Sequence, residues 1–286
     1  MHDGGTLFFV EGCQQFVCRG VHVFVFRQGL RHSVSQHTAG GAGGRVTLCD
    51  VTDAAPRHVT TSAIDGVCFD LDGTLGGYAG DSGGLLALLR SELMLEQCSM
   101  NRFGAVVQEE LRRDGHLTLR LVVERTLDRL EQRVPGDVEK LAQEIAQHYA
   151  AEVRPAPGAA ALLARLDRSG VKLALLSNGP ADMQTAALHA LGFEKYFRVI
   201  LMSGDRDVAA RKPAQRIFSL ACTGLETLPE RTLMIGNDPH ADVAGALAYG
   251  MQALLLGSDR DAAELGVTAV GGLEPLDTLL RTRYRL

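Results

Sequence analysis

The fold is decided by the segment Val67-Cys68-Phe69-Asp70-Leu71-Asp72-Gly73-Thr74-Leu75. A short apolar run ends here in two carboxylates, a glycine and a hydroxyl. Glycines lie before the segment at position 66 and after it at positions 76 and 77, which favours a strand over a piece of a helix. We therefore predict a buried strand that delivers its last residues into a site.

The spacing of the polar residues predicts the chemistry of that site. Side chains alternate along an extended strand, so Asp70 and Asp72 would share one face, and Gly73 permits a turn that returns Thr74 toward them. Two converging carboxylates repel each other unless a cation or a proton lies between them. Oxygen ligands of this kind suit Mg²⁺ better than zinc or copper.

The composition is that of an ordinary globular protein. Of the 286 residues, 46% are hydrophobic and 22% are charged, enough for one large domain or two modest ones. The net charge of −5 is spread along the chain, so it predicts neither nucleic acid nor an anionic membrane as a partner. We expect a small molecule in a pocket; the oligomeric state cannot be predicted.

The cysteine pattern and the lack of long apolar segments predict a cytoplasmic protein. The six cysteines form no CxxC pair, which gives no sign of a zinc site or a disulfide framework. No apolar window reaches the length of a membrane span, and the start lacks the pattern of a signal peptide. Cytoplasmic localisation is the resulting expectation.

Residues 1–60 differ from the rest of the chain. They hold five of the nine histidines and a glycine-rich run at 39–44 that suits a flexible linker. Three interpretations are open: a disordered extension, a small appended β element around residues 21–26, or sequence upstream of an authentic start near Val59. We favour the first or the third and leave this extension out of the fold prediction.

A helical segment follows the first strand. Residues 76–84 are glycine-rich and predict a flexible hinge, after which apolar residues recur at helical spacing. The predicted helices cover residues 85–97, 103–113, 117–133 and 137–151. We assign residues 78–152 to a separate helical domain.

Alternating strands and helices follow. Strands are predicted at 171–176, 199–202, 232–235 and 252–256, with helices at 159–168, 181–191, 214–223 and through Tyr249. This rhythm predicts a three-layer, Rossmann-like α/β core with a parallel sheet, built from residues 61–77 and 153–286. Since ligands of such sheets gather at the carboxyl ends of the strands, the polar residues there are site candidates.

These candidates carry a resemblance to a known family. The hexapeptide at 70–75 resembles the first motif of the haloacid dehalogenase-like (HAD) hydrolases, most of which are phosphatases. Ser177, Lys212 and the stretch 236–242 resemble the second, third and fourth motifs, in the same order along the chain. The resemblance covers residues 63–258, and the helical insert resembles the cap that one HAD subgroup carries at this point.

The resemblance implies a mechanism for a small phosphorylated metabolite. Asp70 is implied to be the nucleophile that forms an aspartyl-phosphate, and Asp72 the general acid and then base. Mg²⁺ is implied to bind Asp70, the Asp72 carbonyl and the fourth motif. The groups implied to stabilise the phosphoryl oxygens are Thr74, Ser177, Asn178 and Lys212.

The fourth motif departs from the family's pattern. An aspartate usually follows its glycine, whereas this chain has Asn237, so either Asn237 or Asp238 is the metal ligand. Asp242 is interpreted as supporting the metal shell or orienting Lys212. His240 is interpreted as a solvated surface residue.

Single residues argue against two other activities known in this family. Halide release needs no acid, and the dehalogenase branch lacks an aspartate at the position of Asp72, so dehalogenation is disfavoured. Phosphonate hydrolysis would need a cap lysine, and the insert offers only Lys140. A phosphomutase and a catalytically silent, ligand-binding relative remain as alternatives to a phosphomonoester hydrolase.

Overall fold

The computed structural model describes residues 13–18, 21–28, 31–36, 63–133 and 136–286. The chain divides into two units, residues 1–58 and 59–286. In the first unit, strands β1 (Cys13–Cys18), β2 (Val21–Gln28) and β3 (Arg31–Gln36) pair as an antiparallel sheet in that order. The remainder of the predicted extension, including Val59, lies outside the described residues.

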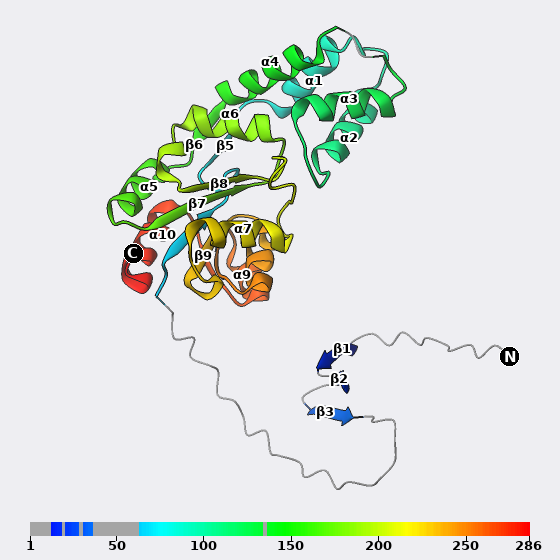
Figure 1. The fold of residues 1–286 in the computed structure, drawn as a ribbon. Helices are drawn as coiled ribbons and strands as arrows, with labels where there is room; N and C mark the ends of the chain where they lie inside the picture. Colours follow the sequence, from blue (N-terminus) through cyan, green and yellow to red (C-terminus); the bar gives the residue numbers. More distant parts are fainter. Residues whose placement is uncertain (1–12, 19–20, 29–30, 37–62, 134–135) are drawn as a thin grey trace, which may run out of the picture. The chain divides into compact units, whose positions relative to one another are not determined.

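The second unit is built on a six-stranded sheet with the order β11-β10-β9-β4-β7-β8 (Figure 1). Every pairing in this sheet is parallel. The strands are β4 (Gly66–Phe69), β7 (Lys172–Ser177), β8 (Val199–Met202), β9 (Thr232–Gly236), β10 (Gln252–Leu256) and β11 (Thr268–Val270). The predicted Rossmann-like α/β fold is confirmed.

Both faces of the sheet are covered by helices because its strands are apolar on both sides. Val67 and Phe69 pack into one cluster with α5 (Ala159–Arg168), α6 (Ala181–Leu191) and α10 (Leu273–Leu279). Cys68 faces the other way, into a cluster with α7 (Gln215–Leu225), α8 (Gly245–Tyr249) and α9 (Asp259–Leu265). This period-two alternation produces the three layers.

The first strand, β4, lies inside the sheet between β7 and β9. The chain builds β7 and β8 on one side of it and then crosses to build β9, β10 and β11 on the other. Ligands of open parallel sheets bind where the strand order reverses in this way, at the carboxyl ends. The polar residues that follow β4, β7 and β9 therefore meet at the reversal point.

A helical insert separates β4 from β7. Helices α1 (Ser82–Glu92), α2 (Met100–Leu111), α3 (Leu119–Arg129) and α4 (Val138–Ala151) share an apolar cluster of their own (Figure 1). Asp137 begins α4, since its carboxylate accepts a hydrogen bond from the Lys140 amide at 3.1 Å. The insert leaves and re-enters the core through β5 (Gly76–Tyr78) and β6 (Val153–Pro155), which pair antiparallel.

Two predictions about this insert are wrong. The predicted hinge at 76–84 includes β5, where tertiary pairing with β6 overrides the preference of glycine for irregular structure, and the first turn of α1, which Asp81 caps. The first helix also ends at Glu92 instead of residue 97. Met94 has a φ of 52°, which a continuing helix does not accommodate.

Several elements of the core were not predicted from the sequence. The region after residue 256 adds α9, β11, α10 and a π-helical turn, η4 (Leu280–Tyr284), and residues 239–244 form another π-helical turn, η3 (Pro239–Ala244). Short 3₁₀ turns occur at η1 (Glu194–Tyr196) and η2 (Pro229–Arg231). Among the described helices, none has the length and apolarity required to cross a membrane.

Candidate active site

Asp70 is the first residue after β4. Its amide donates to the Ile235 carbonyl at 3.0 Å, which extends the pairing of β4 with β9 by one residue and fixes the start of the following loop. The side chain is buried at the carboxyl end of the sheet. The position of this carboxylate is therefore fixed by the sheet and does not depend on the conformation of the following loop.

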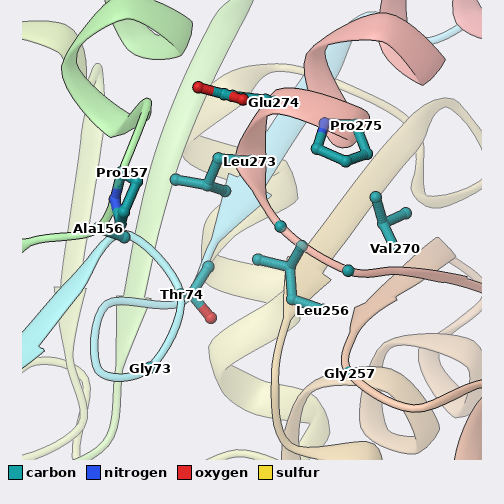
Figure 2. Close-up of a pocket in the computed structure, with 12 residues that line it drawn as sticks. Gly73, Thr74, Ala156, Pro157, Leu256, Gly257, Val270, Leu273, Glu274 and Pro275 are labelled. Atoms are coloured by element: carbon teal, nitrogen blue, oxygen red, sulfur yellow. The ribbon is translucent and has the colours of Figure 1, made fainter.

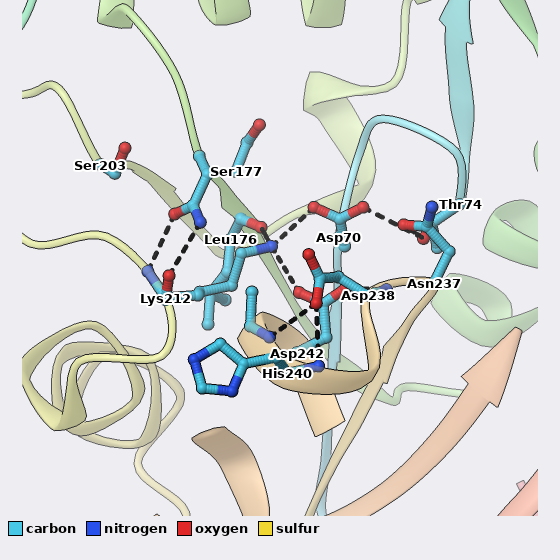
Figure 3. Close-up of polar contacts among 12 residues, drawn as sticks. Asp70, Thr74, Leu176, Ser177, Ser203, Lys212, Asn237, Asp238, His240 and Asp242 are labelled. Carbon is cyan, nitrogen blue, oxygen red and sulfur yellow. Dashed lines mark hydrogen bonds and ion pairs between the residues drawn. The ribbon is translucent and has the colours of Figure 1, made fainter. Parts of the chain in front are cut away.

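Lys212 brings a positive charge to Asp70 (Figure 3). Its Nζ lies 2.6 Å from Asp70 Oδ1, 2.6 Å from the Leu176 carbonyl and 2.7 Å from Asp242 Oδ1. The side chains of Lys212 and Asp242 are only 2% and 1% exposed. One ammonium thus compensates two carboxylates from different motifs. The contact is compatible with the second of the two roles considered for Asp242, the orientation of Lys212.

The charge state of this cluster follows from burial and pairing. Burial alone would lower the pKa of the Lys212 ammonium, but the charges of Asp70 and Asp242 and their hydrogen bonds outweigh it and raise the pKa. Burial raises the pKa of the Asp242 carboxyl to about 6, against the lowering effect of Lys212. Lys212 is accordingly protonated at neutral pH.

The turn after Asp72 depends on Gly73. Gly73 has a φ of 81°, and a Cβ at this position would collide with the Asn237 amide. The turn returns Thr74 so that its hydroxyl donates to Asp70 Oδ2 at 3.1 Å and lies 3.4 Å from the Asn237 amide group. The predicted convergence of Thr74 on Asp70 is confirmed.

Asn237 and Asp238, the two candidate metal ligands, face different partners. The Asn237 side-chain amide faces the Asp72 carbonyl and Asp70 Oδ2; with its nitrogen turned toward these two acceptors, it would donate to them at 3.1 and 3.2 Å. The Asp238 carboxylate accepts from the amides of His240 and Ala241, both at 2.8 Å, and so caps η3. His240 itself is exposed, as predicted.

Asp72 is held by a residue that the sequence did not reveal. The Tyr149 hydroxyl, on α4 of the helical insert, donates to Asp72 Oδ1 at 3.2 Å. Burial raises the pKa of the Asp72 carboxyl, and hydrogen bonds from Gln184 and Tyr149 oppose the rise. In the sequence, Tyr149 is one of many residues on an amphipathic helix, with no motif to single it out.

The polar residues after β7 are already engaged by neighbours. The Ser177 hydroxyl donates to Gln184 Oε1 at 2.9 Å. The Asn178 amide group bonds the Lys212 backbone twice, donating to its carbonyl at 3.0 Å and accepting from its amide at 2.9 Å. Asn178 thus positions the loop that carries Lys212, and a ligand of Ser177 would have to replace Gln184.

The acidic cluster lines a cavity of ≈ 230 Å³. We call it the acidic cavity; its wall is formed by Asp70, Asp72, Asn178, Arg211, Lys212, Asn237, Asp238, Ala241 and Asp242. A second cavity of ≈ 480 Å³ lies where β10 and β11 end (Figure 2). Thr74 and Glu274 are its only polar side chains among the described residues, so the chemistry belongs to the acidic cavity.

The donors at the acidic cavity fit a hard divalent cation. Among the described residues, no three His, Cys, Asp or Glu side chains gather as a metal site, so a cation would need other oxygens. The Asn237 amide group lies within hydrogen-bonding distance of both Asp70 Oδ2 and the Asp72 carbonyl. Rotation of this amide would present its oxygen beside the other two, an all-oxygen set of the kind Mg²⁺ prefers.

Comparison with known proteins gives matches over most of the second unit. A family model described as haloacid dehalogenase-like hydrolase matches residues 64–250. A ribulose-1,5-bisphosphate 5-phosphatase of Halopiger xanaduensis is 30% identical over 69% of this chain and 87% of its own. A phosphoserine phosphatase of Thermus thermophilus is 36% identical over 42% of this chain, and the chain spans about half (48%) of that protein.

Solved structures show the same fold. The crystal structure of a HAD phosphatase from Thermococcus onnurineus superposes with a TM-score of 0.58 over 76% of this chain and 98% of the other. The two sequences are 23% identical, so this likeness bears on the fold alone.

Proposed function

The chain belongs to the haloacid dehalogenase-like hydrolase family, and from this premise we propose that it is a magnesium-dependent phosphomonoester hydrolase working through an aspartyl-phosphate. The resemblance read from the four motifs is thereby confirmed at the level of the family. The observation that carries the proposal is the Lys212 ammonium between Asp70 and Asp242, in the cavity that Asp72 also lines. Such a cluster compensates the charge of a nucleophilic carboxylate while leaving it in place to react.

In the first half-reaction, the Asp70 carboxylate attacks phosphorus in line and the bond to the leaving oxygen breaks. The Asp72 carboxyl, whose pKa burial raises, gives its proton to that oxygen. Lys212 and Thr74 stabilise the charge on the equatorial oxygens. Mg²⁺, held by Asp70, the Asp72 carbonyl and Asn237, would supply further neutralisation of the phosphate.

In the second half-reaction, the Asp72 carboxylate accepts a proton from water as the water attacks the phosphorus of the aspartyl-phosphate. The bond between phosphorus and Asp70 breaks, which releases inorganic phosphate and regenerates both carboxyl groups. Each group thus returns to its starting protonation state.

We further propose that residues 78–152 act as a cap over this site. The Leu117 amide donates to the Gly204 carbonyl and the Leu117 carbonyl accepts from the Ala181 amide, both at 2.9 Å. Arg211 Nη1, from the loop of Lys212, donates to the Leu111 carbonyl at 3.1 Å. A cap docked in this way excludes water from the reacting atoms.

The proposal predicts Mg²⁺-dependent release of phosphate from p-nitrophenyl phosphate. Asp70→Asn should abolish turnover because the amide is not a nucleophile, whereas Asp72→Asn should slow it about 10²–10⁴-fold, the usual weight of general acid–base catalysis. Inorganic phosphate should still bind to the Asp72 variant. Substantial activity in Asp70→Asn would contradict the covalent mechanism.

A further inference from the structure

A third, apolar cavity of ≈ 240 Å³ lies where the helical insert meets the core. We call it the apolar cavity. Its polar lining consists of Tyr78, Ser82, Gln108 and Tyr149, and no lining side chain among the described residues is charged. The apolar part of the lining includes Leu86, Leu89, Val107, Leu119, Ile145 and Met183.

The apolar cavity adjoins the acidic cavity through one hydrogen bond. Tyr149 lines the apolar cavity, and its hydroxyl donates to Asp72 Oδ1 at 3.2 Å, while Asp72 lines the acidic cavity. The Tyr149 ring stacks on Tyr78 with centroids 5.0 Å apart and planes 11° apart, which fixes the phenol between the two cavities.

The position of Asp72 indicates which part of the substrate would occupy the apolar cavity. In the proposed mechanism, Asp72 protonates the leaving oxygen, so the group attached to that oxygen must lie on the Asp72 side of the phosphorus. Tyr149, which donates to Asp72, also lines the apolar cavity, so this cavity lies next to the Asp72 side of the site. We propose, on the basis of the proposed function, that the leaving alcohol is apolar and uncharged, an aryl or branched alkyl group housed in this cavity.

The absence of charge in the described lining argues against ionic leaving groups. A carboxylate or a second phosphate in the apolar cavity would lose its hydration without gaining a cation. Arg211 lines the acidic cavity instead and donates to a backbone carbonyl. The relatives named for phosphoserine and ribulose bisphosphate act on substrates that carry such additional charges, so this chain should differ from them in specificity.

The volume of the apolar cavity sets the size of the group. A protein cavity of about 150 Å³ holds benzene. The ≈ 240 Å³ available here accommodates a single ring with its linking carbon or a branched chain of similar bulk.

A matched pair of phosphonates tests this inference without turnover. Benzylphosphonate and phosphonoacetate share a CH₂–P linkage and differ in having a phenyl ring or a carboxylate. Titration calorimetry of the full-length protein with Mg²⁺ should give about tenfold or more tighter binding of benzylphosphonate, since burial of a ring-sized apolar group accounts for at least one factor of ten. Equal binding, or tighter binding of phosphonoacetate, would overturn the inference.

Two arginine variants localise the effect. Gln108→Arg places a cation at the exposed rim of the apolar cavity and should narrow or reverse the preference for benzylphosphonate. Gln143→Arg adds the same charge to an exposed position of α4 outside that cavity and should leave the preference unchanged. The same preference in both variants would show that the ring binds elsewhere, against the inference.

Hydrolysis of acetyl phosphate separates the inference from the function on which it rests, because its small leaving group does not need the apolar cavity. If acetyl phosphate is hydrolysed but the phosphonates bind equally, the proposed function stands and the inference falls. If acetyl phosphate is not hydrolysed and benzylphosphonate still binds tighter, the proposed function falls while the apolar subsite stands.

Discussion

At the scale of single residues, Lys212 supports two carboxylates that would otherwise repel each other inside the protein. Asp70 directly follows β4, Asp242 lies in η3 after β9, and the Lys212 ammonium lies 2.6 Å from the first and 2.7 Å from the second. Burial makes each charge costly without its partner. The catalytic cluster is therefore also a determinant of stability.

Lys212→Met tests this dual role. Loss of the ammonium leaves two buried, uncompensated carboxylates, and the free energy of unfolding should fall by about 3 kcal/mol or more. Denaturant titration measures the change. Adding Asp242→Asn to the variant should recover part of the stability but none of the turnover; a stable single variant would contradict the role of the ion pair.

Asn237 can be tested as the metal ligand by a change of one atom. Asn237→Asp places a carboxylate beside Asp70 Oδ2 and the Asp72 carbonyl, so Mg²⁺ should bind more tightly and the melting temperature should respond to lower Mg²⁺ concentrations. Thermal unfolding across a Mg²⁺ series measures this.

Asp238→Asn serves as the matched control. Its oxygen can still cap η3, as the Asp238 carboxylate does, so Mg²⁺ binding should not change. Unchanged affinity in Asn237→Asp together with weaker affinity in Asp238→Asn would assign the metal to Asp238 instead.

At the scale of elements, the helical insert depends on a close backbone approach. A Cβ on Gly204 would collide with the Leu117 carbonyl and lie 2.7 Å from the Gly179 carbonyl. Gly204 therefore permits the loop before α3 to dock on the core. Neither chain segment carries a motif, and the contact joins residues 87 positions apart, which is why the sequence did not predict it.

Gly204→Ala should loosen this docking. Loss of one or two hydrogen bonds of about 1 kcal/mol each corresponds to about tenfold faster hydrogen exchange at residues 116–119. Exchange measured by mass spectrometry reports it. Gly271→Ala, where an added Cβ meets nothing within 4 Å, is the control and should leave these amides protected; equal exchange in both variants would contradict the docking role.

At the scale of the whole molecule, the sequence predicts the parts that repeat a local pattern. Strands 199–202 and 252–256 and helices 159–168 and 181–191 were predicted with their observed bounds, because apolar runs and end signals agree there. Of the site candidates named from the sequence, Thr74 and Lys212 lie within hydrogen-bonding distance of Asp70, because Asp70 directly follows β4 and the other two come from loops at the same edge of the sheet.

The sequence does not predict what tertiary contacts decide. Strand β11 has three residues at the sheet edge, too few for a periodic signal, and β5 forms only because β6 lies beside it. Tyr149 reaches Asp72 across 77 positions of sequence. The α/β core and its charged residues can thus be predicted from the sequence, whereas the contacts between the helical insert and the core depend on the three-dimensional structure.

An aspartyl-phosphate on Asp70 can be detected directly by mass spectrometry of the full-length protein, quenched with acid during turnover of a phosphomonoester in Mg²⁺. The account predicts one phosphoryl group on the peptide that contains Asp70, and none in Asp70→Asn. Asp72→Asn should slow hydrolysis of the aspartyl-phosphate and so let it accumulate. If this variant turns over substrate but carries no phosphoryl group on Asp70, the covalent mechanism is contradicted.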